Sequence, residues 1–160
     1  MTGKLLQGLG LAVRVLLGVW FVYNGGIKIF GSGLDRFTTD IANYRMVSAP
    51  WDAIAAYSIP WTELIAGVCL MLGILTRGAI LALTGLVVSF SFAIAWAWFK
   101  GLDISCGCRG GDEPIQYWSK VAEFAGYFII LAWLWNANRE AEDESPASSE
   151  VYDPDPHHHG

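Results

Sequence analysis

Histidine is absent from the body of the chain, and this absence excludes several kinds of catalytic site. The three histidines of the 160-residue sequence stand together at His157–His159, close to the C-terminal end. A Ser–His or Cys–His nucleophile pair therefore lacks its base, and a haem iron lacks an axial histidine. We assign no metal site to the terminal histidines themselves.

Cysteine is scarce as well, with three residues in the whole chain. Two of them, Cys106 and Cys108, share one short polar stretch, whereas a closed zinc site needs four nitrogen or sulfur ligands. Nearby acidic residues that could add oxygen ligands are Asp103, Asp112 and Glu113. We therefore predict no resident metal, and keep the transfer of a soft metal ion through the two thiols as an alternative.

Charge is sparse and unevenly placed. Charged residues make up 16% of the chain and hydrophobic residues 54%, whereas about 25% charged residues is usual in soluble domains. The net charge of -5 comes from an acidic segment rich in proline and serine at residues 139–160. We expect this tail to be disordered and residues 1–138 to form the folded domain. Because that domain is nearly neutral, nucleic acid is excluded as a partner.

Four apolar segments are long enough to cross a bilayer as helices. Residues 79–99 contain no charge, and residues 53–75 contain one carboxylate, Glu63. Both match the length of about 20 residues that crosses the hydrocarbon layer. Residues 11–30 and 121–137 carry a few charges, mostly near their ends, where long side chains reach the headgroups. The sequence therefore predicts an all-α, integral membrane four-helix bundle in contact with the lipid bilayer.

The connection between the first two of these segments predicts one more element. Within residues 31–50, Phe37, Ile41 and Tyr44 recur at helical spacing, which predicts a short interfacial helix in the first loop. Tryptophan and tyrosine gather near the expected helix ends, Trp20 among them, as in the aromatic belts of membrane proteins.

Charged residues inside the apolar segments form a second group of candidates. Glu63 follows Pro60 within an apolar run and cannot face lipid without a large cost. Its candidate partners are Arg14, Lys28 and Arg45. Lys120 and Glu123 are three residues apart on one helix face and can pair locally. Glu63, Glu123 and Lys28 therefore predict either an intramembrane proton or quinone site or a structural ion pair, and we keep both readings.

The pair Cys106-Gly107-Cys108 is the candidate catalytic site. Two thiols one residue apart can close into a strained disulfide, which is easier to reduce than a structural one. The neighbouring Arg109 favours the thiolate of Cys108, while the acidic residues around it act against it. Two unreactive thiols in a turn are the alternative reading. Cys69 lies in an apolar segment and is expected to be a small packing residue.

Several segments together resemble the DoxX / MauE family of small membrane proteins. They are AVRVLLGVWFVYNGGIKIF, IANYRMV, IPWTELIAGVCLMLG and DISCGCRGG, and the resemblance covers about residues 10–137. The CGC loop is closer to the MauE branch, in which Phe usually follows the second cysteine; here Arg109 stands in its place. The resemblance implies a four-helix fold in the bacterial inner membrane, a thiol-redox role for Cys106 and Cys108, and a redox partner protein in methylamine utilisation. DoxX-type proteins are linked to quinone chemistry, so a quinone is the cofactor that the resemblance suggests.

Three functions follow as hypotheses. The first is a thiol–disulfide oxidoreductase or maturation helper. In this hypothesis the protein is a component of an enzyme and passes electrons to a quinone. The second is a non-enzymatic scaffold subunit of a redox complex, alone or as an oligomer. The third is soft-metal delivery.

The side of the membrane that the cysteine loop faces is a separate question. The expected loop side holds six basic residues, Lys28, Arg36, Arg45, Lys100, Arg109 and Lys120, and the other side four, Lys4, Arg14, Arg77 and Arg139. The positive-inside rule thus favours a cytoplasmic loop, whereas a disulfide persists in the periplasm. We expect a periplasmic loop, with several of these bases held in ion pairs.

Overall fold

The computed structural model describes residues 2–102 and 116–143, and the regular structure in these ranges is helical. Helix α1 (Thr2–Gly26) continues through a π-helical turn, η1 (Ile27–Gly31), and is followed by the short helix α2 (Leu34–Asn43). Three long helices follow, α3 (Trp51–Leu72), α4 (Thr76–Phe99) and α5 (Tyr117–Asp143). The predicted all-α fold is confirmed, and α2 occupies the place of the short helix expected in the first loop.

Three helical segments are long and apolar enough to cross a membrane in the described part of the chain. They are Gly8–Gly31, Trp51–Leu72 and Thr76–Phe99, which correspond to the first three predicted spans. The fourth expected span lies in α5, which is 27 residues long but carries Lys120 and Glu123 near its start. The chain is a multi-pass membrane protein, and the crossing by α5 stays a prediction. Helix α5 also runs past the expected domain boundary at residue 138.

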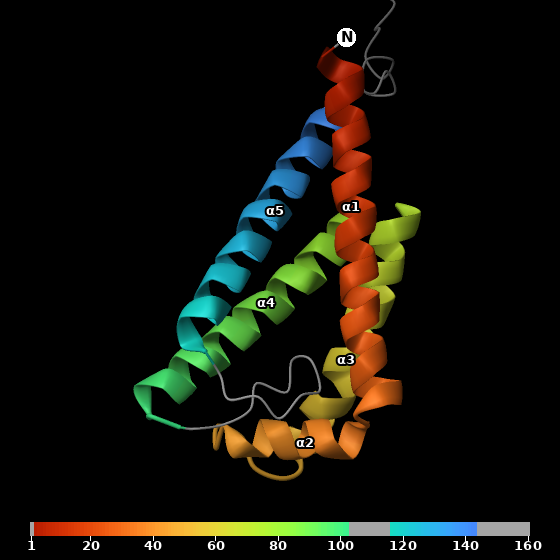
Figure 1. Ribbon diagram of the computed structural model, residues 1–160. Helices are drawn as coiled ribbons and strands as arrows, with labels where there is room; N and C mark the ends of the chain where they lie inside the picture. The colour runs from red at the N-terminus through yellow and green to blue at the C-terminus, as the bar shows by residue number, and fades with distance from the viewer. Residues whose placement is uncertain (1, 103–115, 144–160) are drawn as a thin grey trace, which may run out of the picture.

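The arrangement of the helices brings four helix ends together (Figure 1). Helix α2 lies across the end of the bundle at which α1 and η1 finish and α3 begins. We call this end, where α2 lies, the α2 end of the bundle. Helix α3 runs away from it and ends in a left-handed cap at Gly73 (φ 74°), and α4 then returns toward the α2 end. Helix α4 finishes and α5 begins on the α2 side as well, so residues on both flank the expected cysteine loop.

Helices α1 and α3 make the most extensive contact in the molecule, because glycine lets their backbones touch. A Cβ atom on Gly18 would lie 2.7 Å from the Gly67 carbonyl oxygen, and one on Gly67 would lie 2.8 Å from the Gly18 oxygen. Closer to the α2 end, a Cβ on Gly25 would lie 2.7 Å from the Pro60 oxygen. Small residues at such crossings are typical of membrane helices, which associate through close packing.

The remaining apolar residues divide between a core and a lipid-facing surface. The main core joins α1, α3, α4 and α5 through Leu17, Phe21, Ala66, Leu70, Ala79, Ile80, Leu83, Val87, Leu131 and Leu134. Large apolar side chains also point outward on every long helix, for example Leu16, Ile65, Phe92 and Ile129, which are 58–70% exposed. An exposed apolar surface of this kind suits contact with lipid.

Candidate functional site

Lys28 and Glu63 form a buried ion pair at the α2 end of the bundle. The Lys28 ammonium donates to both carboxylate oxygens of Glu63, each at 2.7 Å. The two side chains are 2% and 4% exposed. Of the three partners expected for Glu63, the structure therefore selects Lys28. Leaving either charge unpaired at this depth would be costly, so each charge requires the other.

Local backbone features place the two charges against each other. Lys28 lies in the π-helical turn η1, a wider turn that often occurs at functional positions. The closeness of α1 to α3 at Gly25 brings this turn next to Glu63, since a Cβ on Gly25 would lie 3.2 Å from the Glu63 Cβ. The ammonium also lies 5.3 Å from the ring centre of Phe37 and 5.1 Å from that of Phe90. Four elements, α2 and α4 included, thus enclose one positive charge.

A second pair, Lys120 and Glu123, lies in the first turns of α5. The Lys120 ammonium donates to Glu123 Oε2 at 2.8 Å, as the spacing of three predicts. The Tyr127 hydroxyl donates to Glu123 Oε1 at 2.9 Å, and itself accepts a bond of 2.6 Å from the Trp20 indole N–H. This hydrogen-bonded chain connects α5 to α1. Trp20, which the sequence places in an interfacial belt, forms part of this polar cluster.

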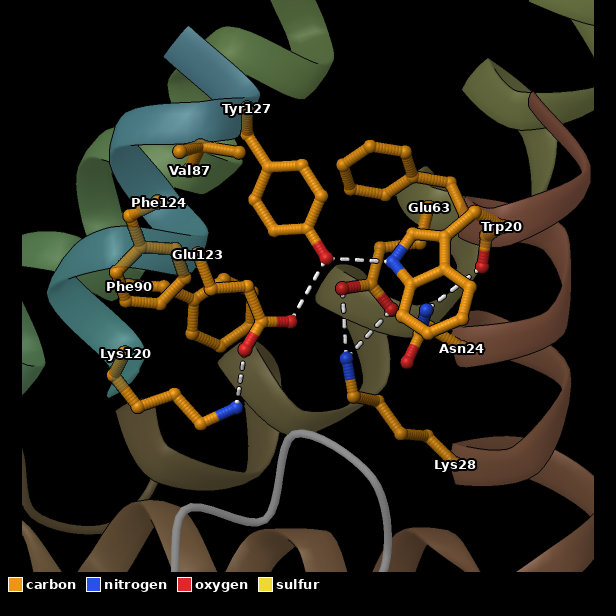
Figure 2. Close-up of a pocket in the computed structure, with 11 residues that line it drawn as sticks. Trp20, Asn24, Lys28, Glu63, Val87, Phe90, Lys120, Glu123, Phe124 and Tyr127 are labelled. Carbon is orange, nitrogen blue, oxygen red and sulfur yellow. Dashed lines mark hydrogen bonds and ion pairs between the residues drawn. The ribbon is translucent and has the colours of Figure 1, made fainter. Parts of the chain in front are cut away.

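The two ion pairs border the same small cavity, as Figure 2 shows. The other residues around it are Trp20, Phe21, Asn24, Val87, Phe90, Phe124 and Tyr127. Its volume is about 40 Å³, and a single water needs about 10–15 Å³ measured in this way. The cavity therefore has room for a few water molecules among its charged groups.

The cavity is much smaller than the pockets of about 300–1,000 Å³ that usually enclose organic ligands. An apolar cavity of about 280 Å³ lies between α4 and α5, bordered by Ile80, Leu81, Thr84, Phe128, Leu131, Ala132, Trp135 and Asn136. This second cavity lies near the start of α4, away from the α2 end of the bundle. The cavity beside Glu63, Glu123 and Lys28 thus has the size for water molecules, and the quinone stays a prediction.

Cys106 and Cys108 lie outside the described residues, but the points where their connection leaves α4 and enters α5 are described. The Tyr117 hydroxyl donates to the Leu102 carbonyl oxygen at 2.7 Å. The Tyr117 ring stacks on Trp98 with ring centres 5.8 Å apart. These contacts hold the two ends of the connection together, within two helical turns of Glu123.

Cys69 is a free thiol that packs against the main core, as expected of a packing residue. It lies toward the Gly73 end of α3, away from the α2 end. Among residues 2–102 and 116–143, no group of three or more His, Cys, Asp or Glu side chains comes close enough to hold a metal ion.

Sequence could identify the charges of this site but not the aromatic residues around them. Glu63, Glu123 and Lys28 are conspicuous as charged residues in apolar surroundings. Trp20 and Tyr127 have no such signal, except that Tyr127 follows Glu123 by four residues on one helix face.

Comparison with known proteins gives one family match. The family described as "Methylamine utilisation protein MauE" matches residues 6–137. No curated protein and no solved structure gave a match. The match covers most of the chain, including all of the cavity residues and both thiols. The chain belongs to the MauE family of membrane proteins involved in methylamine utilisation.

Proposed function

We propose that this protein is a membrane thiol–disulfide redox protein that helps a partner protein of methylamine utilisation to acquire its disulfides. Cys106 and Cys108 would be the exchanging thiols. The observation that carries the proposal is the charged cluster at the α2 end of the bundle, close to Leu102 and Tyr117, where the cysteine connection begins and ends. Membership in the MauE family supports the link to methylamine utilisation.

The exchange breaks and forms bonds only among the two cysteines of this protein and two thiols of the partner. A thiolate of the partner attacks the Cys106–Cys108 disulfide, which gives a mixed disulfide and releases one cysteine of the pair as a thiolate. The second partner thiolate then attacks the mixed disulfide and releases the other cysteine. The partner gains one disulfide and loses two electrons, and the pair is reduced to two thiols. An electron acceptor, a quinone or another disulfide protein, must then reoxidise the pair.

We propose that the cysteine loop faces the periplasm of a bacterial inner membrane. The basic residues that oppose this orientation include Lys28 and Lys120, which are both neutralised by carboxylates. Without these two, the expected loop side and the other side hold equal numbers of basic residues. The positive-inside rule then no longer favours a cytoplasmic loop, and the stability of disulfides outside the cytoplasm favours a periplasmic one.

The test compares Cys106→Ser and Cys108→Ser with Cys69→Ser as the matched control. We expect the first two variants to abolish disulfide formation in the partner while the membrane level of the protein is unchanged, and Cys69→Ser to retain it. Labelling of intact cells with a membrane-impermeant maleimide, before and after reduction, reports the side of the loop and its oxidation state. Normal partner maturation in both serine variants would overturn the proposal.

A scaffold function is the second candidate, and the buried Lys28–Glu63 pair favours it because it fixes the packing of three helices and η1 without any thiol. A scaffold predicts that the serine substitutions are silent while changes at Lys28 or Glu63 disrupt assembly. Soft-metal delivery makes a third prediction, which is stoichiometric copper or zinc bound by the reduced protein and lost on alkylation.

A further inference from the structure

The two carboxylates at the polar cavity are held in different ways. Both oxygens of Glu63 accept from one ammonium, and that ammonium lies between the rings of Phe37 and Phe90. Protonation of Glu63 would leave the charge of Lys28 buried without its counter-charge, which is strongly unfavourable. Lys28 and Glu63 therefore satisfy each other inside the bundle.

Glu123 is held by two different donors and lies nearer to water. Its oxygens accept separately from Lys120 and Tyr127. The side chains of Lys120 and Glu123 are 13% and 21% exposed, several times more than those of the buried pair. If Glu123 takes a proton, the ammonium of Lys120 can still be hydrated at the α2 end. Water therefore reaches the carboxyl group of Glu123 more easily than that of Glu63.

Trp20 fixes the direction of the hydrogen bonds around Glu123. An indole N–H can only donate, so the Tyr127 oxygen must accept from it. The Tyr127 hydroxyl proton is consequently directed at Glu123 Oε1, which keeps the carboxyl group at the wall of the cavity. Tyr127 is thus a positioning residue for Glu123, and the cavity of about 40 Å³ supplies room for water to carry a proton to it.

Among the described residues, the acids that border the cavity are Glu63 and Glu123. Helix α4 contributes only the apolar Val87 and Phe90, and α1 contributes Asn24, which donates to the Trp20 carbonyl oxygen. In the part of the chain that the structure describes, the charged groups that border the cavity with Glu123 are Lys120 on its own helix, Lys28 on η1 and Glu63 on α3. The last two neutralise each other.

We infer that Glu123 is a proton-exchanging site of this membrane protein, positioned by Tyr127 and Trp20, with the mutually bonded Lys28 and Glu63 beside it. The inference rests on the proposed function for its use, because thiol–disulfide exchange needs a group that moves protons. The carboxylate takes the proton from a thiol as the attacking thiolate forms, and the carboxyl group returns it to the thiolate that leaves. One proton is taken and one returned, so the step balances without a further reactant.

Infrared difference spectroscopy of the full chain in lipid nanodiscs tests the inference. Lowering the pH should produce a protonated carboxyl band that shifts in heavy water, as an exchangeable group must. The component of this band that belongs to Glu123 should be missing in Glu123→Gln, as the difference between the wild-type and variant spectra shows, and should be shifted in Tyr127→Phe, because the hydrogen bond to Oε1 is lost. It should be retained in the double variant Lys28→Met/Glu63→Gln, which removes both buried charges together and is expected to keep the fold.

Two results would overturn the inference. One is a band that persists unchanged in Glu123→Gln, and the other is its loss in the Lys28→Met/Glu63→Gln double variant alone. The measurement involves no redox partner, so its failure is distinguishable from failure of the cysteine variants. If the proposed function also holds, Glu123→Gln should flatten the pH profile of thiol exchange, whereas a merely structural change would lower the rate equally at every pH.

Discussion

Removing one charge of the Lys28–Glu63 pair is expected to be among the most destabilising substitutions in the chain. Glu63→Gln keeps the size of the side chain but leaves the Lys28 ammonium uncompensated between two aromatic rings. The ammonium makes two charge-assisted bonds of 2.7 Å to Glu63, each worth about 1.5–3 kcal/mol. Breaking a buried pair by removing one partner costs about 3–5 kcal/mol. We therefore expect the free energy of unfolding to fall by about 3–5 kcal/mol.

The double variant Lys28→Met/Glu63→Gln separates the charge from the packing. Methionine replaces the aliphatic stem of Lys28, and no buried charge is left near the rings of Phe37 and Phe90. Replacement of a complete buried pair by side chains of similar volume is often neutral or stabilising. We therefore expect the double variant to be much more stable than Glu63→Gln alone, so that the two substitutions are strongly non-additive.

Unfolding by sodium dodecyl sulfate in mixed micelles, followed by circular dichroism of the helices, measures these differences. Lys120→Met is the control, because the Lys120–Glu123 pair is partly exposed and pairs of that kind contribute about 0–1 kcal/mol. The reasoning fails if Glu63→Gln costs no more than Lys120→Met. It fails equally if the double variant is as unstable as the sum of its two single substitutions.

Two further predictions concern packing and pH. Gly67→Val should destabilise the protein by about 1–3 kcal/mol, because its Cβ would lie 2.8 Å from the Gly18 oxygen. Gly85→Val is the control and should not, because no atom lies within 4 Å of a Cβ at that position. Equal unfolding midpoints of the two variants in the same micelle assay would refute this prediction. Burial, and then the neighbouring Asp40 and Tyr117, raise the pKa of Tyr44 above the ordinary tyrosine value of about 10. Its stabilising contribution is therefore complete below pH about 10 and is lost as the pH rises toward its folded-state value. Tyr44→Phe should therefore lose less stability than the wild type as the pH rises above about 10. The micelle unfolding assay, repeated over this pH range, measures the difference, and an equal loss in both proteins would contradict the prediction.

The helices of this protein are predictable because long apolar runs leave few alternatives. The spans around Glu63 and at residues 79–99 follow from length and the lack of charge, and α2 follows from the spacing of Phe37, Ile41 and Tyr44. The acidic tail was expected to begin at residue 139, yet α5 continues to Asp143. Local composition does not mark the end of a helix whose last turns lie beyond the apolar run.

The partner of Glu63 could not be chosen from sequence, since three basic residues were compatible with it. Lys28 lies 35 positions away, and the choice depends on the register between α1 and α3. That register is set by glycine contacts such as that of Gly25 with Pro60, which bring the π-helical turn to the level of the carboxylate. A pattern of small residues can indicate that two helices pack closely, but only the packed structure shows which residues then face each other.

The bond between Trp20 and Tyr127 illustrates the same limit more strongly, because it joins residues 107 positions apart. Tryptophan near a helix end is usually explained by the membrane interface, and this explanation needs no partner. In this protein the indole N–H is bonded inside the bundle, where it orients the hydroxyl that contacts Glu123. An aromatic side chain thereby determines the geometry of an acid on another helix. The chemistry of the cluster thus depends as much on its uncharged residues as on the charged ones that sequence makes visible.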